Sequence, residues 1–427
     1  MVTRKLPPHD VADLGLAEAG AARVAWAGGL MPVLGRIGER FASQRPLDGV
    51  RVALCLHLTA ETANLARALA AGGARVSLCA ANPLSTQDDV AAALVAGDGL
   101  EVHAIHGEDL DTYAAHVGAL VAGEPQITLD DGADLISVLH EARPDVVAAM
   151  LGATEETTTG LVRLRAMEAE GRLACPVLAV NESRTERAFN DRYGTGQSAL
   201  DGIIRATNLL LAGSTVVVLG YGWTGTGIAL RAHGLGARVI VCEVDPIRAL
   251  EARMAGFEVL TALDAAERGD IFITVTGGRG VLSAAHFERM KDGAVLANAG
   301  HFDVEIDLDA LAAASSGRRT VRPLVDEFDL GGRRLNLLAS GRVVNLAAAE
   351  GHPPGVMDLS FATHALAVEE LVRRAGELEP GVHPVPADLD REVARLKLDA
   401  LGVRIDELTP EQATYRTSWV PAPHEDA

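Results

Sequence analysis

The chain has 427 residues, a hydrophobic content of 48% and a formal net charge of −20. That length suggests two or more domains with real cores. The acidic balance, without a basic stripe, argues against nucleic acid and anionic membranes as partners. No apolar stretch is long and clean enough to span a bilayer, and the first residues lack the apolar core of a signal peptide, so we expect a cytoplasmic protein.

In the first half of the chain, short β-rich runs alternate with alanine-rich helical stretches. The expected strands are residues 50–57, 75–80, 101–105, 126–130, 146–151 and 177–180, with helices between them such as residues 60–71. Near-continuous apolar strands alternating with helices predict an α/β fold with a doubly wound parallel sheet.

Polar and acidic residues gather directly after these strands. The loops read HLTAET, ANPLSTQD, HGED, DDGAD, GATEETTTG and NESRTE. In open α/β sheets, ligands bind at the carboxyl ends of the strands. Any one polar loop is ordinary, but six in succession favour a substrate cleft at this edge of the sheet.

The last of these loops opens the stretch NESRTERAFNDRYG, residues 181–194. It is dense in groups that can hold or move protons, and it contains no lysine and no cysteine.

A second α/β unit begins near residue 195. A helix is expected over residues 197–213, and strands are expected over residues 215–219, 238–243, 271–276, 294–298 and 320–324. A further helix over residues 358–375 is followed by a proline-rich link and a polar tail. The two units predict two doubly wound parallel-sheet domains, the second of the Rossmann type.

A glycine motif follows the first strand of this second unit. Gly220, Gly222 and Gly225 form GxGxxG after residues 215–219, and the next strand ends at Glu243. The glycines permit a tight turn, backbone approach to a pyrophosphate and close helix packing. A helix N-terminus favours phosphate. Because Glu243 would accept hydrogen bonds from ribose hydroxyls and repel a 2′-phosphate, NAD is the predicted cofactor.

The four cysteines show neither a CxxC pair nor zinc-ligand spacing. They are Cys55, Cys79, Cys175 and Cys242. We expect buried, reduced thiols and no metal site.

Ten distinctive segments are spread along the chain: VADLGLAEAG, CLHLTAET, STQDD, LDDGADL, EETTTG, YGTGQSALDGIIRAT, GYGWTGTG, FERMKDGAVLANAGHFDVEID, GRVVNLAAAEGHPPGVM and GVHPVPADLD. Through these segments, the sequence resembles the S-adenosylhomocysteine hydrolase family over nearly its whole length. The resemblance implies a tightly held NAD that oxidises a ribose 3′-hydroxyl. Loss of the C4′ proton, exchange of thiol for water at C5′ and reduction of the ketone then follow. The ketone makes C4′–H acidic enough for a side-chain base.

The resemblance also implies roles for individual residues. The implied acid–base residues are His57, Asp131, Glu156 and His301, with Asp131 at C4′ and the two histidines near the leaving group and water. The implied substrate-binding residues are Leu56, Thr59, Glu61, Asp191, His352, Met357 and Phe361. The implied cofactor-binding residues are Thr157, Thr158, Thr159, Gly220, Gly222, Trp223, Thr224, Gly225, Glu243, Thr276, Asn298 and Asn345.

The stretch at residues 181–194 departs from the family. Where the family has a lysine, an aspartate and an asparagine that hold the ribose hydroxyls, this chain has Glu186, Asn190 and Asp191. We count Glu186 and Asn190 among the predicted catalytic residues. The usual cysteine near the nicotinamide is Thr195. The formal charge of the three positions is −2 (−1, 0, −1), where the family trio sums to zero.

That charge needs an explanation, because two like charges about 4 Å apart repel by roughly 4 kcal/mol at an effective dielectric near 20. Glu186 could keep a raised pKa and act as the base at O3′. Arg184, Arg187 or Arg192 could supply the missing cation. The site could accept a different sugar or a cationic substrate. Alternatively, Glu186 could point to solvent and matter little.

Three functions stay open at this point. The first is NAD-dependent hydrolysis of S-adenosylhomocysteine to adenosine and homocysteine. The second applies the same 3′-keto chemistry to another nucleoside and ends in epimerisation, elimination or C5′ exchange. The third is a non-catalytic regulator that binds NAD or adenosine.

The resemblance implies a discontinuous domain arrangement. Residues 1–181 and 353–385 are expected to form the substrate domain, residues 198–350 the NAD domain and residues 386–427 a tail. Two hinge segments, near residues 181–197 and 345–358, would allow closure that excludes water. The family forms tetramers, which implies a homo-oligomer, although the C-terminal sequence lacks the lysine and tyrosine that reach a neighbour's NAD.

Overall fold

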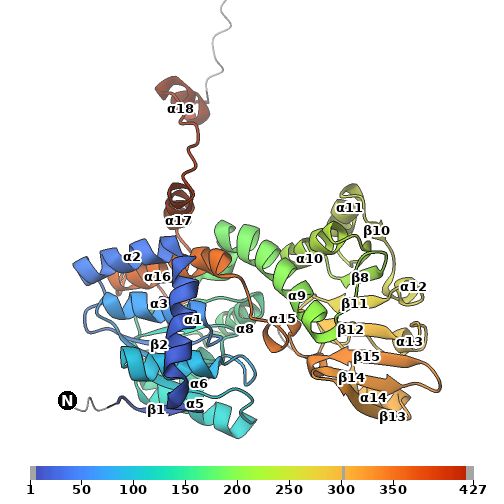
Figure 1. The fold of residues 1–427 in the computed structure, drawn as a ribbon. Coiled ribbons are helices and arrows are strands. Elements are labelled where there is room, and N and C mark those ends of the chain that lie inside the picture. The colour runs from blue at the N-terminus through green and yellow to red at the C-terminus, as the bar shows by residue number, and fades with distance from the viewer. Residues whose placement is uncertain (1–5, 301–302, 420–427) are drawn as a thin grey trace, which may run out of the picture.

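The computed structural model describes residues 6–300 and 303–419, which form two α/β lobes (Figure 1). Each lobe contains one eight-stranded sheet. Among the described helices, none is long and apolar enough to cross a membrane.

The sheet of the first lobe is parallel throughout. Its strands, in spatial order, are β1 (His9–Val11), β4 (Glu101–Ala104), β3 (Arg75–Cys79), β2 (Arg51–Cys55), β5 (Ile127–Asp130), β6 (Gly152–Glu155), β7 (Pro176–Ala179) and β16 (Gly381–Pro384). The final strand, β16, joins the sheet from the far end of the chain by pairing with β7.

Helices cover both faces of this sheet, as the separate apolar cores on its two sides require. The first face packs against α1 (Ala17–Gly29), α2 (Pro32–Gln44), α3 (Ala60–Ala71), α4 (Asp88–Ala93), α16 (Pro354–Arg373) and α17 (Ala387–Ala400). The second face packs against α5 (Leu110–Ala122), α6 (Asp134–Ala142), α7 (Pro144–Val147) and α8 (Thr158–Ala169). All four cysteines are buried.

The sheet of the second lobe is mostly parallel. Its strands, in spatial order, are β10 (Glu258–Val259), β9 (Arg238–Cys242), β8 (Thr215–Leu219), β11 (Ile271–Thr274), β12 (Ala294–Asn298), β15 (Arg334–Leu338), β14 (Val325–Asp329) and β13 (Gly317–Arg322). Only the pairings of β15 with β14 and of β14 with β13 are antiparallel among these strands. The two sheets confirm the predicted α/β class.

The second lobe also buries one core on each face of its sheet. Its helices are α9 (Thr195–Thr207), α10 (Trp223–Gly234), α11 (Pro246–Met254), α12 (Ala262–Ala266), α13 (Ala284–Phe287), α14 (Leu308–Ala314) and α15 (Val344–Ala347). Helices α9 and α15 lie between the lobes in Figure 1.

Three predicted elements differ from the structure. The strand expected over residues 320–324 ends at Arg322 as part of β13, because Leu324 adopts a left-handed turn conformation (φ 63°) before β14. The run at residues 146–151 is not a strand: Pro144 starts the short helix α7, and the strand follows at β6. A short apolar run does not by itself distinguish helix from strand. The helix expected over residues 197–213 ends at Thr207, because Asn208 adopts the left-handed conformation (φ 58°) that terminates helices.

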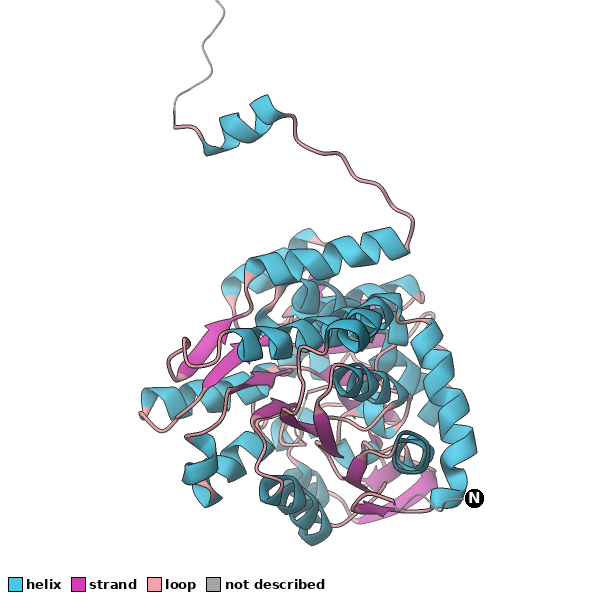
Figure 2. Ribbon diagram, turned by 90° about the vertical axis from the view of Figure 1, so that its left-hand side faces the viewer, coloured by secondary structure: helices cyan, strands magenta, loops and turns pink. Residues whose placement is uncertain are grey.

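The C-terminal region contains more structure than a proline-rich link and a polar tail. After β16, helix α17 packs on α16 and α2 and contributes Val393 to the core of the first lobe. Beyond it, α18 (Pro410–Thr417) stands clear of both lobes (Figures 1 and 2). Every described residue from 401 to 419 is exposed.

Candidate functional site

Three adjacent strands of the first sheet place acid–base side chains together. In the β2–β5–β6 register, Cys55 pairs with Asp130, and Asp130 pairs with Glu155. The residues that directly follow therefore emerge side by side at the carboxyl edge of the sheet. They include three of the predicted catalytic residues, His57, Asp131 and Glu156.

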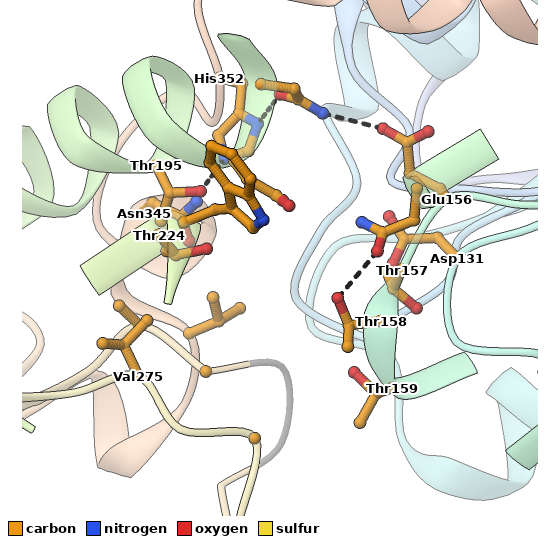
Figure 3. Close-up of a pocket in the computed structure, with 18 of the residues that line it drawn as sticks. Asp131, Glu156, Thr157, Thr158, Thr159, Thr195, Thr224, Val275, Asn345 and His352 are labelled. Carbon is orange, nitrogen blue, oxygen red and sulfur yellow. Dashed lines mark hydrogen bonds between the residues drawn. The ribbon is translucent and has the colours of Figure 1, made fainter. Parts of the chain in front are cut away.

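This edge opens into a cavity of about 440 Å³ that both lobes line. Figure 3 shows two walls, with Asp131, Glu156, Thr157, Thr158 and Thr159 on one side and Thr195, Thr224, Val275, Asn345 and His352 on the other. Segments far apart in the chain therefore meet around one space, as expected for a ligand site between two domains.

Most of the predicted site residues line this cavity. They are Leu56, His57, Thr59, Asp131, Glu156, Thr157, Thr158, Thr159, Asn190, Asp191, Gly222, Trp223, Thr224, Thr276, Asn345, His352, Met357 and Phe361. Five others, Glu61, Gly220, Gly225, Glu243 and Asn298, lie outside its lining, as does Glu186. His301 falls outside the residues that the structure describes.

His57 and Asp131 form a pair on the first wall. His57 Nε2 lies 3.2 Å from Asp131 Oδ2. Burial lowers the pKa of His57 to about 4, so the imidazole is neutral near pH 7. The pair therefore offers a neutral imidazole and a carboxyl group at one point of the cavity.

Glu156 is the centre of a buried hydrogen-bond network. Ser360 Oγ donates to both of its carboxylate oxygens (2.7 and 2.8 Å), and His364 Nε2 lies 2.6 Å from Oε2. Asn190 Nδ2 donates to Oε1 at 3.0 Å. Burial raises the pKa of Glu156 well above its usual range, Ser360 opposes that shift, and Asp131 adds to it.

Glu186 does not point to solvent, because only 1% of the residue is exposed. It lies in the π-helical segment η4 (Glu186–Gly194), where its Oε1 accepts a hydrogen bond from Asn190 Nδ2. Among the described residues, no group donates to its Oε2. Asn190 lines the cavity and Glu186 does not, so the hydrogen bond to Asn190 links Glu186 to the cavity lining.

The arginines of the same segment differ in position. Arg187 lines the cavity, whereas Arg184 is exposed and neither Arg184 nor Arg192 belongs to the lining. Burial raises the pKa of Asp191 to about 7, and Arg187 opposes this shift. Arg187 also pairs with Glu182 at 3.2 Å. Of the three arginines, Arg187 is therefore the one placed to offset negative charge in the cavity.

The burial of Glu186 gives a stability prediction. Burial, followed by Glu156 and Asp191, raises the pKa of its carboxyl group well above the usual range. The folded state then holds a proton that the unfolded state releases, so the free energy of unfolding falls as pH rises above the ordinary carboxyl pKa. Glu186→Gln should flatten this fall at pH values above the ordinary carboxyl pKa, as measured by chemical denaturation over a series of pH values.

Glu182 provides the matched control on the same stretch of chain. Its pKa is lowered, mainly by its hydrogen bonds to Arg165, so its contribution has the opposite sign. Glu182→Gln should lose a small amount of stability near neutral pH without flattening the fall. Equal pH slopes for Glu186→Gln and the unsubstituted protein would show that Glu186 ionises normally in the fold.

On the second wall, the glycine loop has the geometry of a dinucleotide cradle. A Cβ on Gly225 would lie 1.9 Å from the Gly220 carbonyl oxygen, and Gly220 has a φ of 107°. Helix α10 begins at Trp223 with Gly222 as its N-cap, and no described side chain caps its N-terminus. Free helix N–H groups beside a cavity suit a pyrophosphate, so these residues fit NAD.

Two cofactor-site predictions outside the lining, Glu243 and Asn298, hold the loops in place instead. Glu243 accepts hydrogen bonds from the backbone N–H of Tyr221 and Val244, both at 2.6 Å. Asn298 Oδ1 accepts from the Gly300 N–H at 2.8 Å, and its Nδ2 donates to the Gly341 carbonyl. Each of these contacts holds in place a loop that borders the cavity.

Two buried glutamates hold cavity loops in place, although the sequence did not single them out. Glu155 Oε1 accepts from the N–H groups of Gly132 (2.8 Å) and Thr157 (2.9 Å), which ties the loop after Asp131 to the start of α8. Glu305 accepts from the Thr276 N–H and hydroxyl, both at 2.9 Å.

Sequence reasoning also missed Ser360 and His364. These two residues are four apart on α16, on one helix face, and both contact Glu156. His364 is fully buried, and its Nδ1 lies 2.8 Å from Thr154 Oγ1. Two polar residues at helical spacing within the apolar stretch LSFATHALAV were the available signal.

Comparisons with known proteins give a consistent result over most of the chain. Residues 8–146 match the family model described as S-adenosyl-L-homocysteine hydrolase. Residues 191–351 match the model described as S-adenosyl-L-homocysteine hydrolase, NAD binding domain.

Individual relatives cover almost the entire length. An adenosylhomocysteinase of Aquifex aeolicus is 57% identical over 96% of this chain and 98% of its own. One from Gloeobacter violaceus is 55% identical over 96% of both chains. An S-inosyl-L-homocysteine hydrolase of Methanopyrus kandleri is 53% identical over 98% of this chain and 99% of its own.

Proposed function

Because this chain belongs to the S-adenosylhomocysteine hydrolase family, we propose that it oxidises the 3′-hydroxyl of an adenosine-type nucleoside thioether and exchanges thiol for water at C5′. The chain is an NAD-dependent enzyme of the adenosylhomocysteinase type. This family membership favours an enzyme over a non-catalytic regulator. The default reaction is hydrolysis of S-adenosylhomocysteine to adenosine and homocysteine.

One observation carries this proposal. A single cavity contains the His57–Asp131 pair on one wall and the glycine loop of the NAD-binding domain on the other. Redox chemistry at a sugar hydroxyl and proton transfer at its neighbouring carbon need these two parts within one closed space.

The residues of the first wall have distinct proposed roles. Asp131 removes the C4′ proton once C3′ is a ketone, and the neutral His57 beside it serves the leaving thiol and the incoming water. The Glu156 network holds the polar groups around Asn190 in fixed positions. His301 keeps its predicted role near the leaving group.

The residues of the second wall and its rim hold the cofactor. NAD held by these residues would supply a hydride acceptor for the sugar carbon and a hydride donor at the end of the cycle. The backbone at Gly222 and the N-terminus of α10 would hold its pyrophosphate, and Asn345 and Thr276 line the same cavity. Thr157, Thr158 and Thr159 approach from the opposite lobe.

A direct experiment tests the default reaction. The purified full chain, loaded with NAD, is incubated with S-adenosylhomocysteine, and free thiol is measured. We expect thiol and adenosine to be released in equal amounts. Absence of thiol at high enzyme concentration would reject this reaction. Because the Methanopyrus kandleri relative is an S-inosyl-L-homocysteine hydrolase, the inosyl thioether belongs in the same assay, and the ratio of the two rates identifies the base.

A second candidate function rests on the acidic segment. Glu186, Asn190 and Asp191 lie at or directly behind the cavity, with Arg187 as the arginine of that segment in the lining. This composition supports the same 3′-keto chemistry on a different nucleoside, ending in epimerisation, elimination or C5′ exchange. Exchange of C4′–H in D₂O without release of homocysteine would identify it.

A homo-oligomer, a dimer or a tetramer, is also proposed. Residues 401–419 extend away from the body of the chain, and all of them are exposed, including the large side chains of Tyr415 and Trp419. Exposed aromatic side chains on a projecting segment support contact with another subunit. Sedimentation of the full chain and of a chain truncated after residue 400 would test this. The proposed cytoplasmic location follows the sequence prediction.

A further inference from the structure

Three hydrogen-bonded side chains run along the cavity between the two walls. Thr195 Oγ1 lies 3.0 Å from His352 Nε2, and His352 Nδ1 lies 2.5 Å from Asn190 Oδ1. All three residues line the cavity, and Figure 3 shows the hydrogen bonds that leave His352 on both sides. We refer to these side chains as the Thr195–His352–Asn190 relay.

The neighbours of Asn190 determine which nitrogen of His352 carries the proton. Asn190 Nδ2 donates to Glu156 Oε1 (3.0 Å) and to Glu186 Oε1. With both amide N–H groups directed at carboxyl groups, Asn190 Oδ1 faces His352 and can only accept. His352 Nδ1 must then carry the hydrogen. The lone pair of Nε2 is left to accept the hydrogen bond from the Thr195 hydroxyl.

A hydroxyl that donates a hydrogen bond to the unprotonated nitrogen of a neutral imidazole is the arrangement by which general bases remove a proton from an alcohol. Building on the proposed oxidation of a nucleoside hydroxyl, we propose that the Thr195–His352–Asn190 relay accepts the proton of that hydroxyl. The alcohol proton passes to Thr195 Oγ1 as the proton of Thr195 passes to His352 Nε2. The electron pair of the carbon–hydrogen bond leaves as hydride to bound NAD, and a C=O bond forms.

The Thr195–His352–Asn190 relay takes the place of the lysine that the family has within residues 181–194. Glu186, which stands where the resemblance expects that lysine, lies behind Asn190 and does not line the cavity. Asn190 itself is already a donor to two carboxyl groups. Thr195 and His352 face the cavity from the wall that also carries the glycine loop, where a hydroxyl to be oxidised must approach the cofactor.

The charged groups around His352 suit a base that is neutral at rest. Burial, with a further contribution from His57, lowers the pKa of His352 to about 4. Once protonated, the imidazolium donates from Nδ1 to Asn190, whose amide is polarised by Glu156 and Glu186 behind it. Two further acidic groups line the cavity, Asp191 on the same π-helical segment and Asp131 on the first wall.

Paired substitutions at Thr195 test the relay in the NAD-loaded full chain. Adenosine is added, and reduction of the bound cofactor is followed by absorbance. Thr195→Val removes the hydroxyl at nearly constant shape and should slow this step on the order of 10²-fold. Thr195→Ser should recover most of the loss. Thr207→Val, on the same helix but outside the cavity, should have no effect. All four proteins should bind equal amounts of NAD.

The tautomer of His352 is a readout that does not depend on turnover. Nitrogen-15 chemical shifts of histidine-labelled protein, with His352→Gln for assignment, should show Nδ1 protonated and Nε2 bare. Asn190→Asp places a carboxylate on Nδ1. It should raise the pH at which His352 titrates, and the acid limb of the rate of cofactor reduction should move with it. A purely structural role would not move both together.

The outcomes separate this inference from the function on which it rests. If neither adenosine nor inosine reduces the cofactor in the unsubstituted protein, the proposed oxidation is wrong. If the unsubstituted protein is active and Thr195→Val is as fast as Thr195→Ser, the relay alone is overturned. Protonation of His352 at Nε2 instead of Nδ1 would also overturn the relay, whatever the activity.

Discussion

Asp131→Asn is expected to slow C4′ proton exchange by about 10²- to 10⁴-fold, the usual contribution of a positioned general base. An amide keeps the shape of the side chain but cannot take the proton beside the 3′-ketone. Reduction of bound NAD by adenosine should survive, because that step precedes removal of the C4′ proton. The measurement is loss of the C4′ hydrogen from adenosine in D₂O, followed by NMR.

Asp134→Asn is the matched control for this substitution. Asp134 lies three residues farther along, outside the cavity lining, and its carboxylate contacts Arg163 (2.6 Å) and Tyr113 (2.9 Å). The Asp134→Asn substitution also removes one negative charge close to the site, and it should leave the rate of C4′ proton exchange close to normal. An unchanged exchange rate in Asp131→Asn would show that Asp131 is not the base at C4′, and His57 would then be the next residue to test for that role.

Gly225→Ala is expected to weaken NAD binding by about 10²-fold or more, which corresponds to about 3 kcal/mol. The new Cβ would lie 1.9 Å from the Gly220 carbonyl oxygen, a backbone atom that cannot rotate away. The loop must open and the start of α10 must shift, so the backbone N–H groups no longer converge on a pyrophosphate. Equilibrium dialysis with NAD measures the loss.

Gly234→Ala offers a control at the other end of the same helix. A Cβ at Gly234 meets nothing within 4 Å, so alanine fits there. It should bind NAD normally and raise stability by no more than about 1 kcal/mol, through helix propensity. Unchanged NAD affinity in Gly225→Ala would mean that the dinucleotide does not use this loop.

The parts of the site governed by local chemistry could be read from the sequence. The strand at residues 215–219, the glycine turn after it and the start of α10 follow from residue types at fixed spacing. The resemblance to the family, and not the local pattern, singled out His57, Asp131 and Glu156. The parallel register, which the strand pattern implies, then brings them together.

Other parts depend on contacts that no local pattern encodes. Ser360 and His364 bind Glu156 across 204 and 208 residues of chain. The burial of Glu186 arises from a π-helical segment, whose turn differs from the spacing that sequence periodicity assumes. The run at residues 146–151 became helix and turn because Pro144 favours a helix start, an effect that outweighed its apolar composition.

Absorbance of reduced nicotinamide after adenosine is mixed with the NAD-loaded full chain tests the central claim most directly. If a dinucleotide in this cavity oxidises a sugar hydroxyl, the absorbance should rise within one turnover and approach one reduced cofactor per occupied site. A protein that demonstrably holds NAD but shows no rise with adenosine or inosine would contradict the account.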